Sequence, residues 1–305
     1  MADTDFEILD PAFERLVNTS ARVERLWGRG RWTEGPAYFP ALRSLVFSDI
    51  PNDQLLRWDE TTGKTGALVA GAGRYTNGNT VDREGRLISC EHGTRRVTRT
   101  EHDGSLTVLV DRFEGKRFNS PNDVVVKSDG SIWFTDPAYG IDSNYEGYEA
   151  DPELDGCYVY RLDPQSGACR IVADDFSRPN GLAFSLDEKK LFIVDSAGTA
   201  HGKGEKHMRV FDVGDDGSLT GGSVFASCTA GGFDGFRFDN RGRIWTSAGD
   251  GVHCLDSTGK LLGKILIPEC VSNVCFGGPK RHRLFITATT SLYSVLMPVT
   301  GWKTF

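Results

Sequence analysis

The sequence predicts an all-β protein, a single six-bladed β-propeller with four-stranded antiparallel blades and a short N-terminal helix. The main observation is a repeat, in which a polar lead residue comes just before a short run typical of a strand, as in Asn180-Gly181-Leu182-Ala183-Phe184. The lead residues recur at intervals close to the ~40–50-residue period of propeller blades. The six lead residues are Glu34, Asn77, Asn122, Asn180, Asp234 and Ser272.

A second observation is that turn signals and a further apolar strand follow the lead residues. Asp82-Arg83-Glu84-Gly85 and Asp239-Asn240-Arg241-Gly242 are two such turns. Asp and Asn favour turns through bonds from side chain to backbone, and Gly supplies a positive φ. A second strand comes next, for example Ile132-Trp133-Phe134. Six matches in one register favour a propeller over a two-sheet sandwich.

The N-terminal segment has two predicted elements. Asp10 followed by Pro11 is typical of an N-cap and first helical position, so we predict a short helix ending at Leu16. The last repeat, from Ser272, shows only three clear strands, and an open ring would leave an unpaired edge. We therefore predict that residues 23–27 supply the outer strand of the last blade, so that residues 1–305 form one domain.

Two polar insertions interrupt the repeat and are predicted to be loops. Residues 142–156 lengthen the third blade and carry Tyr145 and Tyr148, and residues 198–206 lengthen the fourth. Long loops on a propeller often overhang the channel, so we expect both to shape access to it.

Composition excludes several classes of function. The chain has 305 residues, 25% of them charged, and a net charge of −7 without any block of like charge, which argues against a nucleic-acid partner. The sequence has no long apolar run typical of a membrane helix and no basic-then-apolar N-terminus typical of a signal peptide. We therefore expect a cytoplasmic protein, with an exported one as the alternative if a signal peptide was removed. The seven cysteines include no C-x-x-C pair, which indicates reduced thiols rather than zinc ligands. Nothing in the sequence sets the oligomeric state.

The lead residues are also the candidate site. If all inner strands run the same way, the side chains of Glu34, Asn122, Asn180 and Asp234 converge at one mouth of the channel. Two carboxylates with amide oxygens suit a hard cation such as Ca²⁺. A single Asp-Gly or Asn-Gly pair is more often a turn, but turns do not require an acid at two blade starts. We expect one divalent cation, Ca²⁺ first, with Mg²⁺, Mn²⁺ or Zn²⁺ as alternatives.

Other catalytic motifs are absent from the sequence. It contains no G-x-S-x-G elbow and no H-E-x-x-H helix motif. His92 and His253 stand alone in strand-like surroundings, where a structural role is the more common one.

In the lead residues and the motifs around them, the chain resembles the SMP-30/gluconolactonase/regucalcin-like family, in particular its bacterial gluconolactonase branch. The resemblance spans nearly the whole chain, and it implies a six-bladed propeller with a divalent metal at the channel mouth. The motifs that carry it are Glu34-Gly35-Pro36, Phe47-Ser48-Asp49-Ile50-Pro51, Cys90-Glu91-His92-Gly93, Pro121-Asn122-Asp123, Trp133-Phe134-Thr135-Asp136-Pro137, Arg178-Pro179-Asn180-Gly181-Leu182-Ala183-Phe184-Ser185 and Asp234-Gly235.

The resemblance also implies roles for individual residues. The metal ligands of the family match Glu34, Asn180 and Asp234, and the family aspartate, here Asp234, is also the general base. A further family asparagine near metal and substrate matches Asn122.

Substrate contacts are expected from a second group of residues. The family arginine that binds sugar lactone stands two residues before that asparagine, whereas Arg117 stands five before it. We assign substrate binding to Asn122, Arg117, Asn119, Asn77 and Tyr139, and expect Tyr139 and Trp245 to line the mouth or to pack between blades.

The predicted function is metal-dependent hydrolysis of a sugar lactone, with a small-molecule lactone as the partner. Two alternatives stay open at this stage. One is a phosphotriesterase on the same metal site, and the other is a non-enzymatic calcium-binding propeller.

Overall fold

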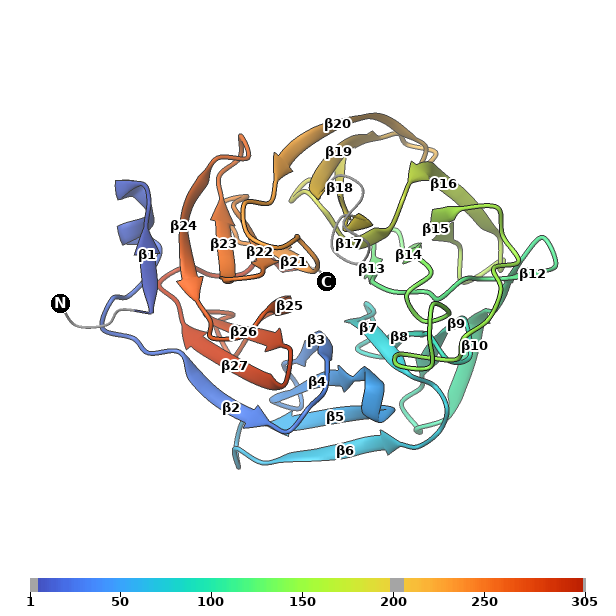
Figure 1. Cartoon of the computed structure of the whole chain (residues 1–305), viewed down its shortest axis with the longest axis horizontal. Coiled ribbons are helices and arrows are strands. Elements are labelled where there is room, and N and C mark those ends of the chain that lie inside the picture. Colours follow the sequence, from blue (N-terminus) through green and yellow to red (C-terminus); the bar gives the residue numbers. More distant parts are fainter. Residues whose placement is uncertain (1–4, 198–205, 304–305) are drawn as a thin grey trace.

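The computed structural model describes residues 5–197 and 206–303, and it confirms the six-bladed β-propeller. Six antiparallel sheets stand around a central channel (Figure 1). In each sheet the strand that comes first in the repeat lies innermost, and successive inner strands contact one another around the ring. The blades, from the inner strand outward, are β3 (Thr33–Phe39), β4 (Ser44–Asp49), β5 (Gln54–Asp59) and β6 (Thr65–Ala70); β7 (Thr76–Val81), β8 (Leu87–Glu91), β9 (Arg96–Thr100) and β10 (Leu106–Val110); β13 (Val124–Val126), β14 (Ile132–Asp136), β15 (Cys157–Leu162) and β16 (Cys169–Phe176); β17 (Pro179–Phe184), β18 (Lys190–Asp195), β19 (His207–Val213) and β20 (Leu219–Ser227); β21 (Phe236–Phe238), β22 (Ile244–Ala248), β23 (Gly251–Leu255) and β24 (Leu261–Leu266); and β25 (Val271–Gly277), β26 (Arg283–Ala288), β27 (Ser291–Leu296) and β2 (Glu24–Gly28).

The ring is closed by the N-terminal segment. Strand β2 pairs antiparallel with β27 of the sixth blade, where the sequence analysis places residues 23–27. At the inner end of the same junction, the Ser272 hydroxyl donates to the Thr33 carbonyl at 2.6 Å. The strand pairing and the Ser272–Thr33 hydrogen bond both join the last blade to the first part of the chain. The edge strand that an open ring would expose is therefore paired.

The N-terminus differs from the sequence prediction in two respects. The predicted helix is the 3₁₀ helix η1 (Pro11–Arg15), in which the Asp10 side chain accepts from the Ala12 N–H at 2.8 Å. Before it, β1 (Phe6–Ile8) adds a fifth strand to the outer edge of the fifth blade by pairing with β24. Its three residues are too few to show a period in the sequence.

Trp245 does not line the mouth. Its side chain is fully buried, its ring lies 6.0 Å from the ring of Phe13, and its indole N–H donates to Asp239 at 3.1 Å. Phe13 is itself fully buried and belongs to the same core cluster as the inner side of β24. Of the two roles expected for Trp245, lining the mouth or packing in the interior, the structure shows packing.

Glycines after the lead residues let neighbouring blades approach closely. A Cβ on Gly35, Gly78 or Gly181 would lie 2.1, 2.2 and 2.1 Å, respectively, from the carbonyl oxygen of the next blade's lead residue. The N–H of Gly78 donates to that carbonyl, on Asn122, at 2.8 Å. Glycine therefore recurs at positions where the backbones of two neighbouring blades touch. It is required there by packing, as well as being a turn signal.

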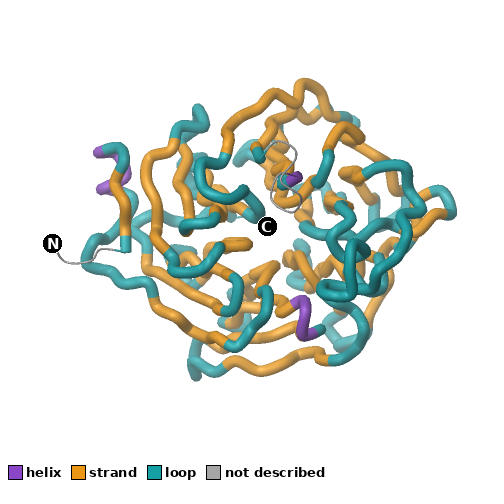
Figure 2. The backbone as a smooth tube through the Cα atoms, viewed as in Figure 1, coloured by secondary structure: helices purple, strands orange, loops and turns teal. Residues whose placement is uncertain are grey.

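The third-blade insertion, residues 142–156, forms a loop without helix or strand, among the loops to the right of the channel (Figure 2). The Tyr145 hydroxyl reaches the Arg31 carbonyl at 3.4 Å, and the Tyr148 ring packs edge-on against Tyr75 at 5.2 Å. Arg31 and Tyr75 come just before the inner strands of the first and second blades, so the loop spans several blades. The fourth-blade insertion lies outside the described residues except for Lys206.

Two short elements lie outside the four-stranded blades. Strands β11 (Arg112–Phe113) and β12 (Lys116–Arg117) form a hairpin between the second and third blades, and η2 (Ile50–Asn52) follows β4. Within residues 5–197 and 206–303, no helix has the length and apolar character needed to cross a membrane.

Candidate functional site

The lead residues occupy the same end of the channel. Glu34 and Asn180 are the second residues of β3 and β17, and Asn122 and Asp234 stand two residues before β13 and β21. Because all six inner strands begin at this end, these side chains gather at one mouth. Glu34, Asn122 and Asn180 are buried, with 4–5% exposure, and Asp234 is half-buried.

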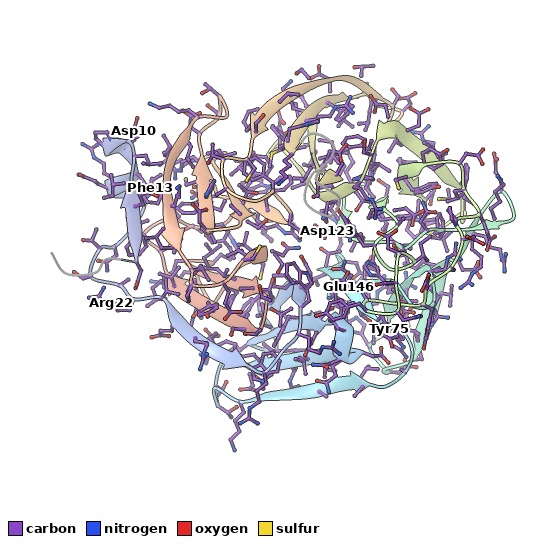
Figure 3. The ribbon with its side chains drawn as sticks, viewed as in Figure 1. Asp10, Phe13, Arg22, Tyr75, Asp123 and Glu146 are labelled. Carbon is purple, nitrogen blue, oxygen red and sulfur yellow. The ribbon has the colours of Figure 1, made fainter. Side chains whose placement is uncertain are left out.

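Four carboxylates influence one another electrostatically at this mouth. Burial is the main cause that raises the pKa of Asp234 well above its usual range, and the charges of Glu34, Asp123 and Glu146 raise it further. Burial likewise raises the pKa of Glu34, with Asp123 and Glu146 adding to the shift. Figure 3 shows Asp123 and Glu146 toward the middle of the ring. The site therefore holds acids whose charges would repel one another in buried surroundings, which favours their protonated forms.

Amide groups hold these carboxylates in place. The Asn273 amide donates to Glu34 Oε2 at 3.0 Å, and it also bonds to the side chain of Asp123. The N–H of Gly35 donates to the same Glu34 oxygen. The side chain of Asn180 bonds to Asp234. Each of these bonds favours the ionised carboxylate, which partly offsets the effect of burial.

Asp123 has a cation on its other side. Arg237 Nη1 lies 3.8 Å from Asp123 Oδ2, and its charge is the largest influence that lowers the pKa of Asp123 against the raising effect of burial. Oδ2 makes no hydrogen bond within the described residues, whereas Oδ1 accepts from the Val124 N–H at 2.8 Å.

Asn77 has a buried side-chain oxygen without a hydrogen-bond partner among the described residues. Its amide nitrogen lies 3.1 Å from His92 Nε2, and His92 Nδ1 lies 3.2 Å from the carbonyl of Glu146. Burial lowers the pKa of His92 to about 4, so the ring is neutral and bonds as an acceptor at Nε2 and a donor at Nδ1. This arrangement turns Asn77 Oδ1 away from the ring, and that buried oxygen has no hydrogen-bond partner among residues 5–197 and 206–303.

The other residues assigned to substrate are held by contacts of their own. The Arg117 guanidinium donates to the Thr94 carbonyl at 3.2 Å, and the Asn119 amide donates to the carbonyls of Asp136 and Gly156. The structure therefore does not bring Arg117 and Asn119 to the carboxylates. The Tyr139 ring lies under the Arg178 guanidinium, 4.9 Å from its carbon.

Sequence reasoning missed Asp123, Asn273 and Glu146. Asp123 and Asn273 take the position after the lead residue, where the other four blades have glycine. The sequence did contain a signal for these two residues, because each places a polar side chain at a position where the other four blades have glycine. Glu146 comes from an insertion loop, so the repeat gave no indication of its location.

A divalent cation fits this donor set. In the described part of the chain, no group of three or more His, Cys, Asp or Glu is arranged as a metal site, so a cation would need amide oxygens beside the acids. Asn180 stands next to Asp234, and the side chain of Asn122 makes no hydrogen bond to another described residue. Carboxylate and amide oxygens are hard ligands, and a cation would relieve the repulsion among the acids.

The chain is similar to known lactonases over most of its length. The sequence model of the SMP-30/gluconolactonase/LRE-like region matches residues 32–290. A gluconolactonase of Zymomonas mobilis is 30% identical, over 93% of this chain and 84% of its own length. A pentonolactonase of Haloferax volcanii is 28% identical, over 90% of this chain and 84% of its own. The solved structure of a gluconolactonase from Xanthomonas campestris is 41% identical with a TM-score of 0.89, and the match covers 97% of this chain and 95% of that one.

Proposed function

Because the chain belongs to the SMP-30/gluconolactonase/LRE-like family, we propose that it is a lactonase that hydrolyses a sugar lactone to the hydroxy acid, with one bound divalent cation. The observation that carries the proposal is the gathering of Glu34, Asp234 and Asp123 at the channel mouth, where Asn77 also has an unpaired amide oxygen among the described residues. The similarity to gluconolactonases and to a pentonolactonase supports an aldonolactone as the substrate. Ca²⁺ is the cation we favour, since the donors are all oxygen.

Glu34, Asn180 and Asp234 would hold the cation, with Asn122 beside them. When bound, the cation supplies positive charge next to the lactone carbonyl oxygen as negative charge develops there. The Asn273 amide and the Gly35 N–H keep Glu34 in one orientation, and Asn180 does the same for Asp234.

Asp234 is the proposed general base. Its carboxylate accepts a proton from a water molecule as the water oxygen bonds to the carbonyl carbon. The ring C–O bond then breaks, and the proton returns from Asp234 to the departing alkoxide oxygen, which gives the open hydroxy acid. Half-burial leaves Asp234 accessible to the water and the lactone.

Asn77 is the proposed contact for a substrate hydroxyl. Its Oδ1 is a buried acceptor without a partner among the described residues, and His92 fixes the orientation of the amide. Leaving such an oxygen unpaired costs stability, so a sugar hydroxyl that donates to it would supply the bond that the buried oxygen lacks.

The test is hydrolysis of glucono-δ-lactone by chelator-treated protein after each cation is added back. Glu34→Gln and Asp234→Asn keep shape and remove charge, and each is expected to lower kcat/KM by about 10²–10⁴-fold. Asp187→Asn, an exposed turn residue at the opposite end, is the matched control and should retain full activity.

Parallel assays separate the alternatives. An organophosphate triester cleaved faster than the lactone would favour the phosphotriesterase. Cation binding without turnover of a panel of aldonolactones would favour the non-enzymatic propeller. Lactonase activity that survives intact in Glu34→Gln or Asp234→Asn would contradict the mechanism.

A further inference from the structure

A cavity lies at the opposite end of the channel from the carboxylates. Its volume is about 410 Å³, within the range of small-molecule pockets. All six inner strands contribute to it with their C-terminal halves, and the C-terminal residues Trp302 and Lys303 complete the wall. Figure 1 shows the C-terminus in the middle of the ring in projection. We call this space the lower cavity.

The lower cavity is separate from the candidate active site. None of the six lead residues lines it. Arg237 does, and it stands three residues after Asp234 on the fifth-blade inner strand, which corresponds to about 10 Å along an extended chain. The ion pair between Arg237 and Asp123 lies between the two spaces.

The walls of the lower cavity are mainly apolar. Val125, Ala183, Phe184 and Phe276 come from three different inner strands, and Trp302 is 39% exposed beside them. A half-open apolar surface of this kind, ringed by polar residues, is typical of a binding site for an apolar group.

The rim carries an excess of unpaired positive charge. Arg83 and Lys303 are exposed and make no ion pair with any other described residue, and Arg281 bonds to a backbone carbonyl. Two acids line the rim among the described residues. Glu188 is paired with a lysine at 3.2 Å, which leaves Asp187 against the three cations in that part of the chain. An anion at the rim would therefore be attracted.

We propose that the lower cavity binds a small amphipathic anion, whose aromatic or acyl body lies against Phe184, Phe276 and Trp302 and whose carboxylate or sulfonate lies near Arg83 and Lys303. Neither the apolar walls alone nor the charges alone define this ligand class, because a sugar would leave the walls unfilled and an apolar neutral molecule would not use the cations. The site is independent of the proposed lactonase reaction.

The test uses the fluorescent aryl sulfonate 8-anilinonaphthalene-1-sulfonate as the probe on the full chain. We expect one dye per chain and displacement of the dye by octanoate at concentrations where 1-octanol does not displace it. The double variant Arg83→Glu with Lys303→Glu should weaken dye binding by about tenfold or more at low ionic strength, and the difference should shrink as salt is added.

The matched control is Lys189→Glu with Lys280→Glu, which makes the same change in net charge at exposed lysines that do not line the cavity. It should bind the dye within about twofold of the unmodified chain. Trp302→Phe should lower energy transfer from tryptophan to the bound dye, which places the dye in the lower cavity.

Three results would overturn the proposal. They are several dyes per chain of similar affinity, equal weakening in the two charge-reversed variants, and energy transfer unchanged in Trp302→Phe. Each variant is at an exposed position, and unchanged thermal unfolding would show that the fold is intact.

Discussion

Replacing Gly181 with alanine tests the contact that brings two site residues together. Gly181 follows Asn180, and a Cβ at this position would lie 2.1 Å from the carbonyl oxygen of Asp234 and 3.0 Å from the Cα of Gly235. Its φ is not positive, so the effect comes from crowding and not from backbone strain. Because the obstructing atoms are backbone, the fourth and fifth blades must move apart to make room.

The cost of this movement can be estimated from overpacked interiors. Forcing a methyl group into close-packed structure costs about 1–3 kcal/mol and sometimes more, and backbone neighbours at this distance place Gly181→Ala near the upper end, about 3 kcal/mol. For a chain of 305 residues, the unfolding entropy of roughly 2 cal/mol/K per residue converts this into a fall in Tm of about 5 °C. The bond between Asn180 and Asp234 crosses the same junction, so we also expect kcat/KM for glucono-δ-lactone to fall about tenfold or more.

The assay pairs thermal unfolding with lactone hydrolysis at a temperature well below either transition. Gly66→Ala is the matched control, since a Cβ there meets nothing within 4 Å, and it should leave Tm unchanged or raise it slightly. A Gly181→Ala protein with the Tm and activity of the unmodified chain would refute the view that blade contact at this glycine positions the site.

Three further predictions concern the N-terminus, a buried histidine and the insertion loop. Phe13→Ala should lower the free energy of unfolding by about 3–5 kcal/mol, because the Phe13 side chain is fully buried against Trp245. Leu9 is half-exposed, so Leu9→Ala should change the free energy of unfolding by less than about 0.5 kcal/mol. Equal effects of the two variants in denaturant unfolding would argue against a structural role for the N-terminal segment. His92, whose pKa is lowered to about 4 by burial, takes up a proton less readily folded than unfolded, so its contribution is complete above pH 6.5 and is lost as the pH falls toward 4, by about 2 kcal/mol between pH 7 and pH 5. Over that interval His92→Gln should lose less stability than the unmodified chain by this amount, and identical losses in urea titrations would contradict the assignment. Tyr148→Ala removes the ring that packs on Tyr75 and should raise KM for the lactone more than it lowers kcat, which steady-state kinetics would check; unchanged KM would show that the loop does not shape access.

The repeat made most of the fold predictable from the sequence. Lead residues such as Asn180 and Asp234 recur because each blade needs a strand start of the same form. Glycine follows four of them because a Cβ there would meet the next blade, its backbone at three positions and the Asn273 side chain at Gly235. Strand β1 was not predicted, because its three residues are too few to show a pattern and it forms by pairing with β24.

The candidate site was less predictable than the fold. Glu34 and Asp234 were found because they stand in the repeat, whereas Glu146 reaches the mouth through a loop whose course depends on contacts such as that of Tyr148 with Tyr75. Arg117 was assigned from its distance along the chain to Asn122, but the β11–β12 hairpin directs its side chain to a carbonyl of the second blade. Spacing in sequence sets the register of strands, but it does not set the direction of a side chain in a loop.

Crystals of the unmodified chain grown with Mn²⁺, measured at a wavelength where manganese scatters anomalously, test the central claim most directly. We predict one strong peak at the channel mouth, about 2.0–2.6 Å from oxygens of Glu34, Asn180 and Asp234. A peak elsewhere, or no peak at a saturating concentration of the ion, would contradict the claim that these residues from separate blades together bind a cation.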